Sequence, residues 1–134
     1  MKFTYPNSLK SLEKLASDLE VFQEKANIDS KAIFELNLCM DEIITNIILY
    51  GFEDKDLHTI DVILDWTDQE IIVVISDTGK PFDPLKDAPV PNIEAEIEDR
   101  PVGGLGVYFL KQYLDSVNYI REGNSNRLVL RKKR

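Results

Sequence analysis

Proline is concentrated in one stretch of the chain, and this stretch divides the sequence into two parts that can form regular structure. Five of the six prolines lie within residues 81–101. Proline lacks a backbone N–H and fixes φ, so neither a helix nor a central strand can run through this region. We therefore expect residues 77–103 to form a long connection. Connections of this length inside a compact domain usually have a function, often as a lid.

Before this connection, periodic apolar residues predict two helices. A short strand over residues 3–5 opens the chain, and Asn7 or Ser8 is expected to cap the first helix. Asn27 and Ile28 end it. Its apolar residues recur at spacings of three and four, which predicts that one face looks inward: Leu9, Leu12, Leu15, Leu19 and Phe22.

The second helix is expected to follow a cap at Asp29 or Ser30 and to end near Tyr50. Gly51 then stands where many helices end in a left-handed residue. The β-branched run at residues 43–48 could instead form a strand, but the length of the segment and its caps favour a helix. The side chains expected to face the core are Leu36, Met40, Ile43 and Ile47.

Strands are predicted on both sides of the proline-rich connection. Residues 59–66 alternate between apolar and polar side chains, and residues 71–76 are almost continuously apolar. This pattern predicts a hairpin whose second strand is covered on both faces. The elements expected after the connection are a third helix over about 105–114 and strands over 116–121 and 127–131.

Helices and strands are partly segregated along the chain, which is typical of the α+β class. We expect a two-layer α/β sandwich in which three helices cover a mixed, mostly antiparallel sheet. With 134 residues the chain has the size of a single domain, residues 1–134, and can bury a core without a disulfide or a metal.

Composition excludes several classes of protein. The net charge is −8, whereas a nucleic-acid-binding protein normally carries a basic excess. One cysteine and one histidine leave no internal disulfide and too few soft ligands for a zinc site. The chain has neither the apolar core of a signal peptide nor an apolar run of about 20 residues that could span a membrane, so we expect a cytoplasmic protein.

Three motifs could carry chemistry, and the first lies in the second predicted helix. Glu42 and Asn46 are four residues apart and therefore share a face. A carboxylate can accept a proton, and an amide oxygen is a hard, neutral ligand that suits Mg²⁺ when phosphates supply the remaining charge. The alternative interpretation is a solvated polar stripe.

The second motif follows the predicted central strand. Asp77 ends that strand and Gly79 follows two residues later, which places a carboxylate at the mouth of the core. A carboxylate accepts hydrogen bonds and can bind an exocyclic amine such as the N6 group of adenine. The alternative is an ordinary Asx turn, in which Asp77 bonds the backbone ahead of it.

The third motif is Gly103-Gly104-Leu105-Gly106, before the third predicted helix. Without Cβ atoms a phosphate can approach the backbone, and the first N–H groups of a helix are unpaired donors. The segment is not a P-loop, because Gly-Lys-Ser/Thr is absent, and it makes a poor dinucleotide fingerprint, because no strand immediately precedes it. The alternative is a flexible hinge.

Taken together and in this order, the motifs resemble the GHKL ATP-binding fold shared by gyrase, histidine kinases and MutL-type proteins. Within it, the chain is similar to the anti-sigma-factor serine/threonine kinases of the RsbW and SpoIIAB type, over about residues 7–130. The segments that carry the resemblance are Asp41-Glu42-Ile43-Ile44-Thr45-Asn46, Asp77-Thr78-Gly79-Lys80-Pro81-Phe82-Asp83-Pro84 and Gly103-Gly104-Leu105-Gly106.

The resemblance implies a role for each motif. Glu42 matches the catalytic base, Asn46 the Mg²⁺ ligand and Asp77 the adenine-reading carboxylate. Gly79 matches the glycine that lets the base approach, and the ATP lid would span about residues 83–103. The residues implied to bind the nucleotide after the lid are Gly104, Leu105 and Gly106.

One departure from the family pattern lies in the final predicted strand. It begins Asn124-Ser125-Asn126-Arg127-Leu128, where many relatives have Gly-Thr. The threonine hydroxyl that touches adenine in those relatives is therefore absent, and Ser125 is a weak substitute for it. This departure bears on the affinity for ATP more than on the fold.

The resemblance implies an ATP- and Mg²⁺-dependent serine/threonine protein kinase. It would transfer the γ-phosphoryl group of ATP to a STAS-domain antagonist of the anti-sigma factor and regulate by partner switching. A sigma factor and a second copy of the chain are further implied partners, whereas nucleic acid and membrane are not. The alternatives are an ATP-gated protein-binding regulator without kinase activity, whose lid ATP would order, and a scaffold that has lost nucleotide binding.

Overall fold

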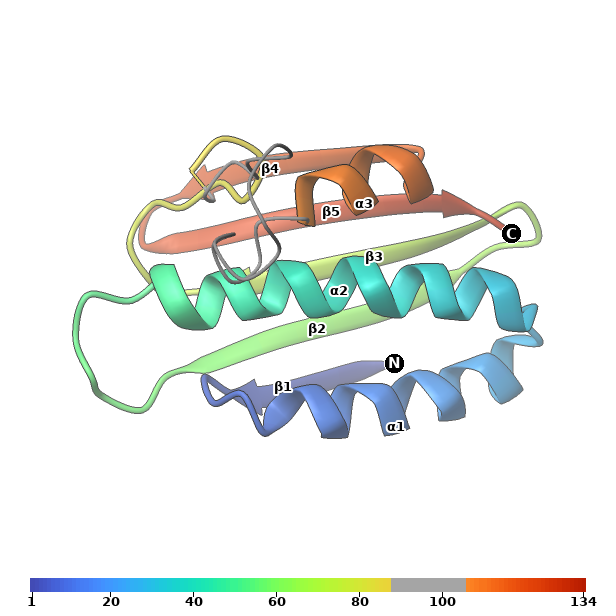
Figure 1. Ribbon diagram of the computed structural model, residues 1–134, viewed down its shortest axis with the longest axis horizontal. Helices are drawn as coiled ribbons and strands as arrows, with labels where there is room; N and C mark the ends of the chain where they lie inside the picture. The colour runs from blue at the N-terminus through green and yellow to red at the C-terminus, as the bar shows by residue number, and fades with distance from the viewer. Residues whose placement is uncertain (88–105) are drawn as a thin grey trace, which may run out of the picture.

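A five-stranded sheet forms one layer of the molecule, and helices form the other (Figure 1). The computed structural model describes residues 1–87 and 106–134. The strand order is β1-β2-β3-β5-β4, and each neighbouring pair is antiparallel, which confirms the predicted two-layer α+β class. The strands are β1 (Lys2–Pro6), β2 (Thr59–Trp66), β3 (Glu70–Asp77), β4 (Ser116–Glu122) and β5 (Ser125–Lys133). The described helices are α1 (Ser11–Ala26), α2 (Ser30–Tyr50) and α3 (Gly106–Tyr113).

The core lies between the sheet and the helices, with α2 between α1 and α3 (Figure 1). The side chains predicted to form the core face of α2 are at most 3% exposed. Full burial of one such side chain is worth about 1.5–3 kcal/mol, so the contact between these side chains and the sheet, called the seam below, holds α2 firmly in place. None of the described helices is long and apolar enough to cross a membrane. The sheet residues that complete the seam are Ile60, Val62, Leu64, Ile71, Val73 and Ile75.

The expectation that β3 is covered on both faces is wrong. Ile71, Val73 and Ile75 are buried, whereas Ile72 and Val74 point to the other face and are only partly buried. The helices that the structure describes all lie on one side of the sheet (Figure 1). An antiparallel sheet can leave its second face to solvent, so the apolar run in β3 reflects its central position and the strand preference of Ile and Val.

The predicted cap of α1 is also wrong. The N-cap residue is Lys10, and no side chain caps the helix. The Asn7 side chain instead binds the residue that precedes β2: its Oδ1 accepts the His58 N–H at 3.0 Å. The helix therefore starts at Ser11, and Leu9 lies before it with 51% of its surface exposed.

The start and the end of α2 are confirmed, at Ser30 and Tyr50, but the conformation predicted for Gly51 is wrong. Asp29 is the N-cap, and its side chain accepts the Lys31 N–H. Gly51 is the C-cap residue, but its φ of −82° is right-handed and not left-handed as predicted. The glycine is needed for space: a Cβ added at Gly51 would lie 2.6 Å from the Ile47 carbonyl oxygen.

The two caps make a testable pair. Asp29→Ala removes the N-cap hydrogen bond of α2 and is expected to lower the free energy of unfolding by about 1 kcal/mol. Ser8→Ala is the matched control, because Ser8 does not cap α1 and its Oγ makes only a long, exposed bond of 3.4 Å to the Lys10 N–H, so stability should change by less than about 0.5 kcal/mol. Urea denaturation followed by circular dichroism measures both. An equal or larger loss for Ser8→Ala would contradict these cap positions.

Candidate functional site

Four buried side-chain oxygens on α2 have no partner in the described part of the chain: Asn37 Oδ1, Asp41 Oδ1, Glu42 Oε2 and Asn46 Oδ1. Two of them, Glu42 Oε2 and Asn46 Oδ1, lie one helical turn apart on the face that carries the first motif. Asn46 is 2% exposed, although its residue type is mostly found at protein surfaces. Buried polar groups are nearly always hydrogen-bonded, so a helix with four such exceptions borders a place where a ligand can supply missing bonds, and Glu42 and Asn46 are the pair that shares one face there.

Burial also tunes the Glu42 carboxyl. It raises the pKa of Glu42, and the neighbouring Asp41 carboxyl raises that pKa further. Both effects disfavour a negative charge at this position. A carboxylate whose pKa is raised is a better proton acceptor than an exposed glutamate, provided that it is ionised at the working pH.

The second motif lies at the end of β3. Asp77 is 6% exposed, and its Oδ1 accepts the Gly79 N–H at 2.8 Å, so the Asx turn is present. Oδ1 also accepts a hydrogen bond from Asn126 Nδ2 at 3.0 Å. Burial raises the pKa of the Asp77 carboxyl, whereas the hydrogen bonds from Asn126 and Gly79 and the charge of Arg121 act to lower it. The turn uses Oδ1 only, which is compatible with a binding role for Oδ2.

Gly79 joins the two motifs. The Lys80 N–H donates to the Gly51 carbonyl oxygen at 3.0 Å, which ties the end of α2 to the turn after β3. A Cβ added at Gly79 would lie 2.3 Å from that same Gly51 oxygen and 3.1 Å from the Phe52 ring. The chain itself therefore requires glycine here, whether or not a base approaches it.

Beyond this turn the surface is hollow. A cavity of about 430 Å³ is lined by residues from the end of α2 and from the turn after Gly79. The Tyr50 and Phe82 rings lie 6.4 Å apart at its wall. The lining residues are Tyr50, Lys80, Pro81, Phe82 and Asp87.

Asn126 is the site residue that the sequence did not reveal. The structure places Asn126, not Ser125, opposite Asp77 in the β3–β5 ladder. Ser125 pairs instead with Glu122, next to the turn between β4 and β5. A signal was available: side chains alternate along a strand, so Asn126 shares the core face with Leu128, which is 3% exposed.

The third motif lies at the edge of the described residues. Gly104 and Leu105, and the predicted lid beyond residue 87, fall outside them, whereas Gly106 is the first residue of α3. The helix predicted over 105–114 is observed over Gly106–Tyr113.

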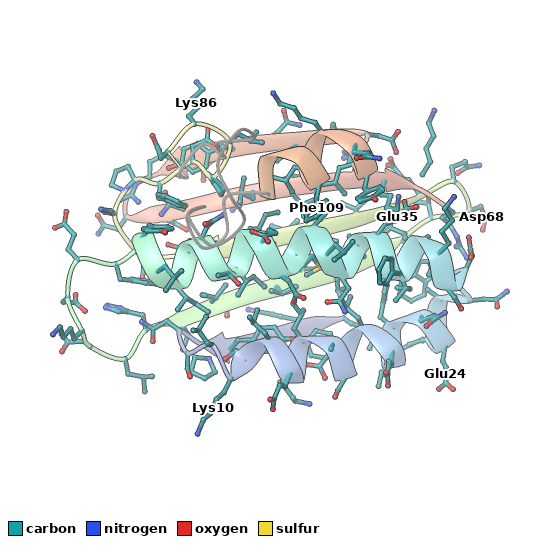
Figure 2. All side chains as sticks on the ribbon, viewed as in Figure 1. Lys10, Glu24, Glu35, Asp68, Lys86 and Phe109 are labelled. Atoms are coloured by element: carbon teal, nitrogen blue, oxygen red, sulfur yellow. The ribbon has the colours of Figure 1, made fainter. Side chains whose placement is uncertain are left out.

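Two contacts hold α3 against α2 beside the Glu42 face, where Figure 2 labels Phe109 and Glu35. Cys39 Sγ donates to the Phe109 carbonyl oxygen, and burial raises the pKa of the Cys39 thiol to about 12, so it stays a protonated packing residue. Lys132 Nζ binds Glu35 Oε2 at 2.7 Å and the Tyr113 carbonyl oxygen at 2.9 Å. Together these contacts hold α3, the helix that follows the third motif, in place beside α2.

The described residues hold no group of three His, Cys, Asp or Glu side chains that could bind a metal ion on their own. Asn46 Oδ1 is nevertheless a suitable single ligand for Mg²⁺, which in proteins is usually held by one or two side chains together with water and substrate phosphates. The unpartnered Asn46 oxygen therefore fits a magnesium ion that arrives with a polyphosphate.

In short, helices cover one face of an antiparallel sheet, a carboxyl and a buried amide lie on the central helix, and a carboxyl lies at the end of the central strand. A family model described as the histidine kinase-like ATPase domain matches residues 5–132, and the chain belongs to this family. Domains of this family bind ATP.

Two known proteins are similar to this chain. It is 30% identical over 97 residues to the serine/threonine-protein kinase BtrW of Bordetella bronchiseptica, a match that covers 72% of this chain and 68% of that protein. The histidine kinase domain of a blue-light activated histidine kinase from Erythrobacter litoralis has the same fold, with a TM-score of 0.57 and 14% identity. That match covers 92% of this chain, which spans 59% of the solved chain.

The close contact at Gly79 can be tested by mutation. Gly79→Ala places a Cβ against the Gly51 carbonyl oxygen, which the end of α2 holds in place, and should cost about 3 kcal/mol of stability. Gly123→Ala is the control: its φ is +56° but its surroundings are open, so it should cost about 1 kcal/mol through backbone strain alone. Urea unfolding compares the two. A loss for Gly79→Ala no larger than that of the control would contradict the contact.

Proposed function

We propose that the chain is a cytoplasmic, ATP- and Mg²⁺-dependent serine/threonine protein kinase of the anti-sigma-factor type. Its substrate would be a serine or threonine of a STAS-domain antagonist, and it would regulate by partner switching, with a sigma factor as a second partner and a homodimer as the working form. The observation that carries the proposal is the pair of buried, unpartnered oxygens on Glu42 and Asn46 in a histidine kinase-like ATPase domain. The similarity to a protein named as a serine/threonine kinase supports phosphoryl transfer to protein.

In this proposal Asp77 reads the base. Its Oδ1 is occupied by the Gly79 N–H and by Asn126, so Oδ2 would accept a hydrogen from the exocyclic amine of adenine. The Gly79 turn and the wall formed by Tyr50 and Phe82 would flank the nucleotide. Gly104, Leu105 and Gly106 would offer backbone N–H groups to the phosphates.

Asn46 would hold Mg²⁺ through Oδ1, with the nucleotide phosphates completing the coordination. The ion, when bound, would neutralise charge on the β- and γ-phosphates. Because Asn46 lies on a buried helix face, it would hold the ion, and with it the phosphates, at a fixed position relative to Glu42.

Glu42 would act as the base. Its carboxylate would accept the proton of the substrate hydroxyl while the hydroxyl oxygen forms a bond to the γ-phosphorus. The bond from that phosphorus to the bridging oxygen breaks, and its electron pair leaves with ADP. Burial and Asp41 raise the pKa of Glu42, which brings its proton affinity closer to that required of a base near neutral pH.

Glu42→Gln keeps the size of the side chain and removes its ability to accept a proton. We expect ATP binding to stay within about threefold of the wild type, whereas transfer of the γ-phosphoryl group to the protein substrate falls at least about 100-fold. Transfer of radiolabelled phosphate to a STAS-domain protein measures the reaction, and Glu53→Gln, an exposed glutamate in the loop after α2, is the control.

Two outcomes would overturn parts of this proposal. Undiminished transfer by Glu42→Gln would show that Glu42 is not the base. Tight ATP binding by the wild type without any transfer to the STAS-domain protein would favour an ATP-gated protein-binding regulator instead.

A further inference from the structure

We propose that Asn126, oriented by Tyr119 and Arg121, is a positioning residue that holds the Asp77 carboxylate in the orientation that selects a base with an exocyclic amine. The inference rests on the proposed role of Asp77 as the base-reading group. It concerns the part of the site in which the sequence departs from the family pattern, and it assigns a task to three residues outside the motifs.

Asp77, Asn126 and Arg121 form a row across three strands. Asn126 on β5 is the register partner of Asp77 on β3, and Arg121 on β4 is the register partner of Asn126. Tyr119 lies two residues before Arg121 and therefore on the same face of β4. The row is part of the sheet, so its geometry does not depend on a loop.

The Asn126 carboxamide has one allowed orientation. Its Nδ2 donates to Asp77 Oδ1 at 3.0 Å and to the Lys80 carbonyl oxygen at 2.7 Å. Its Oδ1 accepts hydrogen bonds from the Tyr119 hydroxyl and from Arg121 Nη1. The Phe82 N–H also lies 3.4 Å from Oδ1. A flipped amide would set its oxygen against two acceptors and its NH₂ group against the guanidinium, so Tyr119 and Arg121, together with this backbone N–H, determine which end of Asn126 faces Asp77.

This orientation determines what Asp77 can bind. Two donors, the Gly79 N–H and Asn126 Nδ2, occupy Oδ1 and prevent rotation of the carboxylate. Oδ2 is left as an acceptor, which suits an amino group and repels the carbonyl oxygen of a 6-oxopurine. Arg121 also donates to the Gly79 carbonyl oxygen at 2.8 Å, so the same residue fixes both the carboxylate and the turn beside it.

Asn126 is 3% exposed, so its hydrogen bonds are shielded from water and have a large effect on the groups they hold. A carboxylate held by one bond instead of two would be free to rotate, and its preference for an amino group over an oxo or unsubstituted position would fall. Selectivity for the base, not only stability, should therefore depend on Asn126.

The test compares the affinity for ATP with that for purine riboside triphosphate, which lacks the 6-amino group. We expect wild type to prefer ATP and Asn126→Ala to reduce the ratio of the two affinities about tenfold, the effect of a hydrogen bond to a charged group. Asn124→Ala is the matched control: Asn124 lies in the exposed β4–β5 turn, and its replacement should leave the ratio unchanged. Calorimetric titration measures all affinities.

Asn126→Asp gives a second, independent measurement. It places a second carboxyl about 3 Å from Asp77. Two carboxylates this close repel each other, so the pKa of one of them rises and the pair shares a proton, although Arg121 and the Tyr119 hydroxyl face the other oxygen of the new carboxyl and offset part of this rise. At low pH the shared proton keeps the pair bonded; as pH rises it is lost, and the repelling carboxylates move apart. ATP affinity of Asn126→Asp should therefore fall at least about tenfold between pH 5 and pH 8, while that of the wild type changes far less.

Each outcome decides between explanations. An unchanged affinity ratio in Asn126→Ala, together with loss of that ratio in Asp77→Asn, would overturn the positioning role and leave Asp77 as the base reader. No ATP binding by the wild type, or an unchanged ratio in Asp77→Asn, would overturn the proposed role of Asp77 and this inference with it. If Asn126→Ala does not fold, Tyr119→Phe removes only the orienting hydroxyl and should lower the ratio about threefold; no change in that variant would overturn the role of Tyr119.

Discussion

The hydrogen bond between the Lys80 N–H and the Gly51 carbonyl oxygen is the contact on which the site depends. It ties the end of α2 to the turn that follows β3, and the close approach of Gly79 to Gly51 leaves that turn no room to move toward the helix. The buried seam between α2 and the sheet aligns the two elements along their length. Glu42 and Asn46 are in this way held in a fixed relation to Asp77 by packing and backbone contacts.

The net charge of the chain bears on how the site can bind a polyphosphate. A chain with a net charge of −8 repels a polyphosphate at long range, although salt screens this repulsion beyond about 8 Å at physiological ionic strength. Affinity for ATP must then arise locally. The buried Asn46 amide offers an oxygen without a charge of its own, and burial raises the pKa of both Glu42 and Asp77, which makes their negative charges less favourable than at the surface.

Local patterns in the sequence predicted most of the fold and the positions of its motifs. The helix carrying Glu42 and the strand ending at Asp77 follow from apolar periodicity and from caps within a few residues. The errors arose where distant parts of the chain decide the outcome. Asn7 does not cap α1 because His58, 51 residues away, binds its side chain. Asn126 was missed because its importance depends on the pairing of β3 with β5, and strand register is set by the whole sheet.

In the proposed function, the unpartnered Asn46 oxygen on α2 would receive a magnesium ion together with ATP. Calorimetric titration of ATP with and without Mg²⁺, on wild type and on Asn46→Ala, tests it directly, with the exposed Asn118→Ala on β4 as the control. We expect Mg²⁺ to strengthen ATP binding at least about tenfold in the wild type and in the control, and to have little effect in Asn46→Ala. If ATP affinity depended equally on Mg²⁺ in Asn46→Ala and in the wild type, or on Mg²⁺ in neither, Asn46 would not be the magnesium ligand.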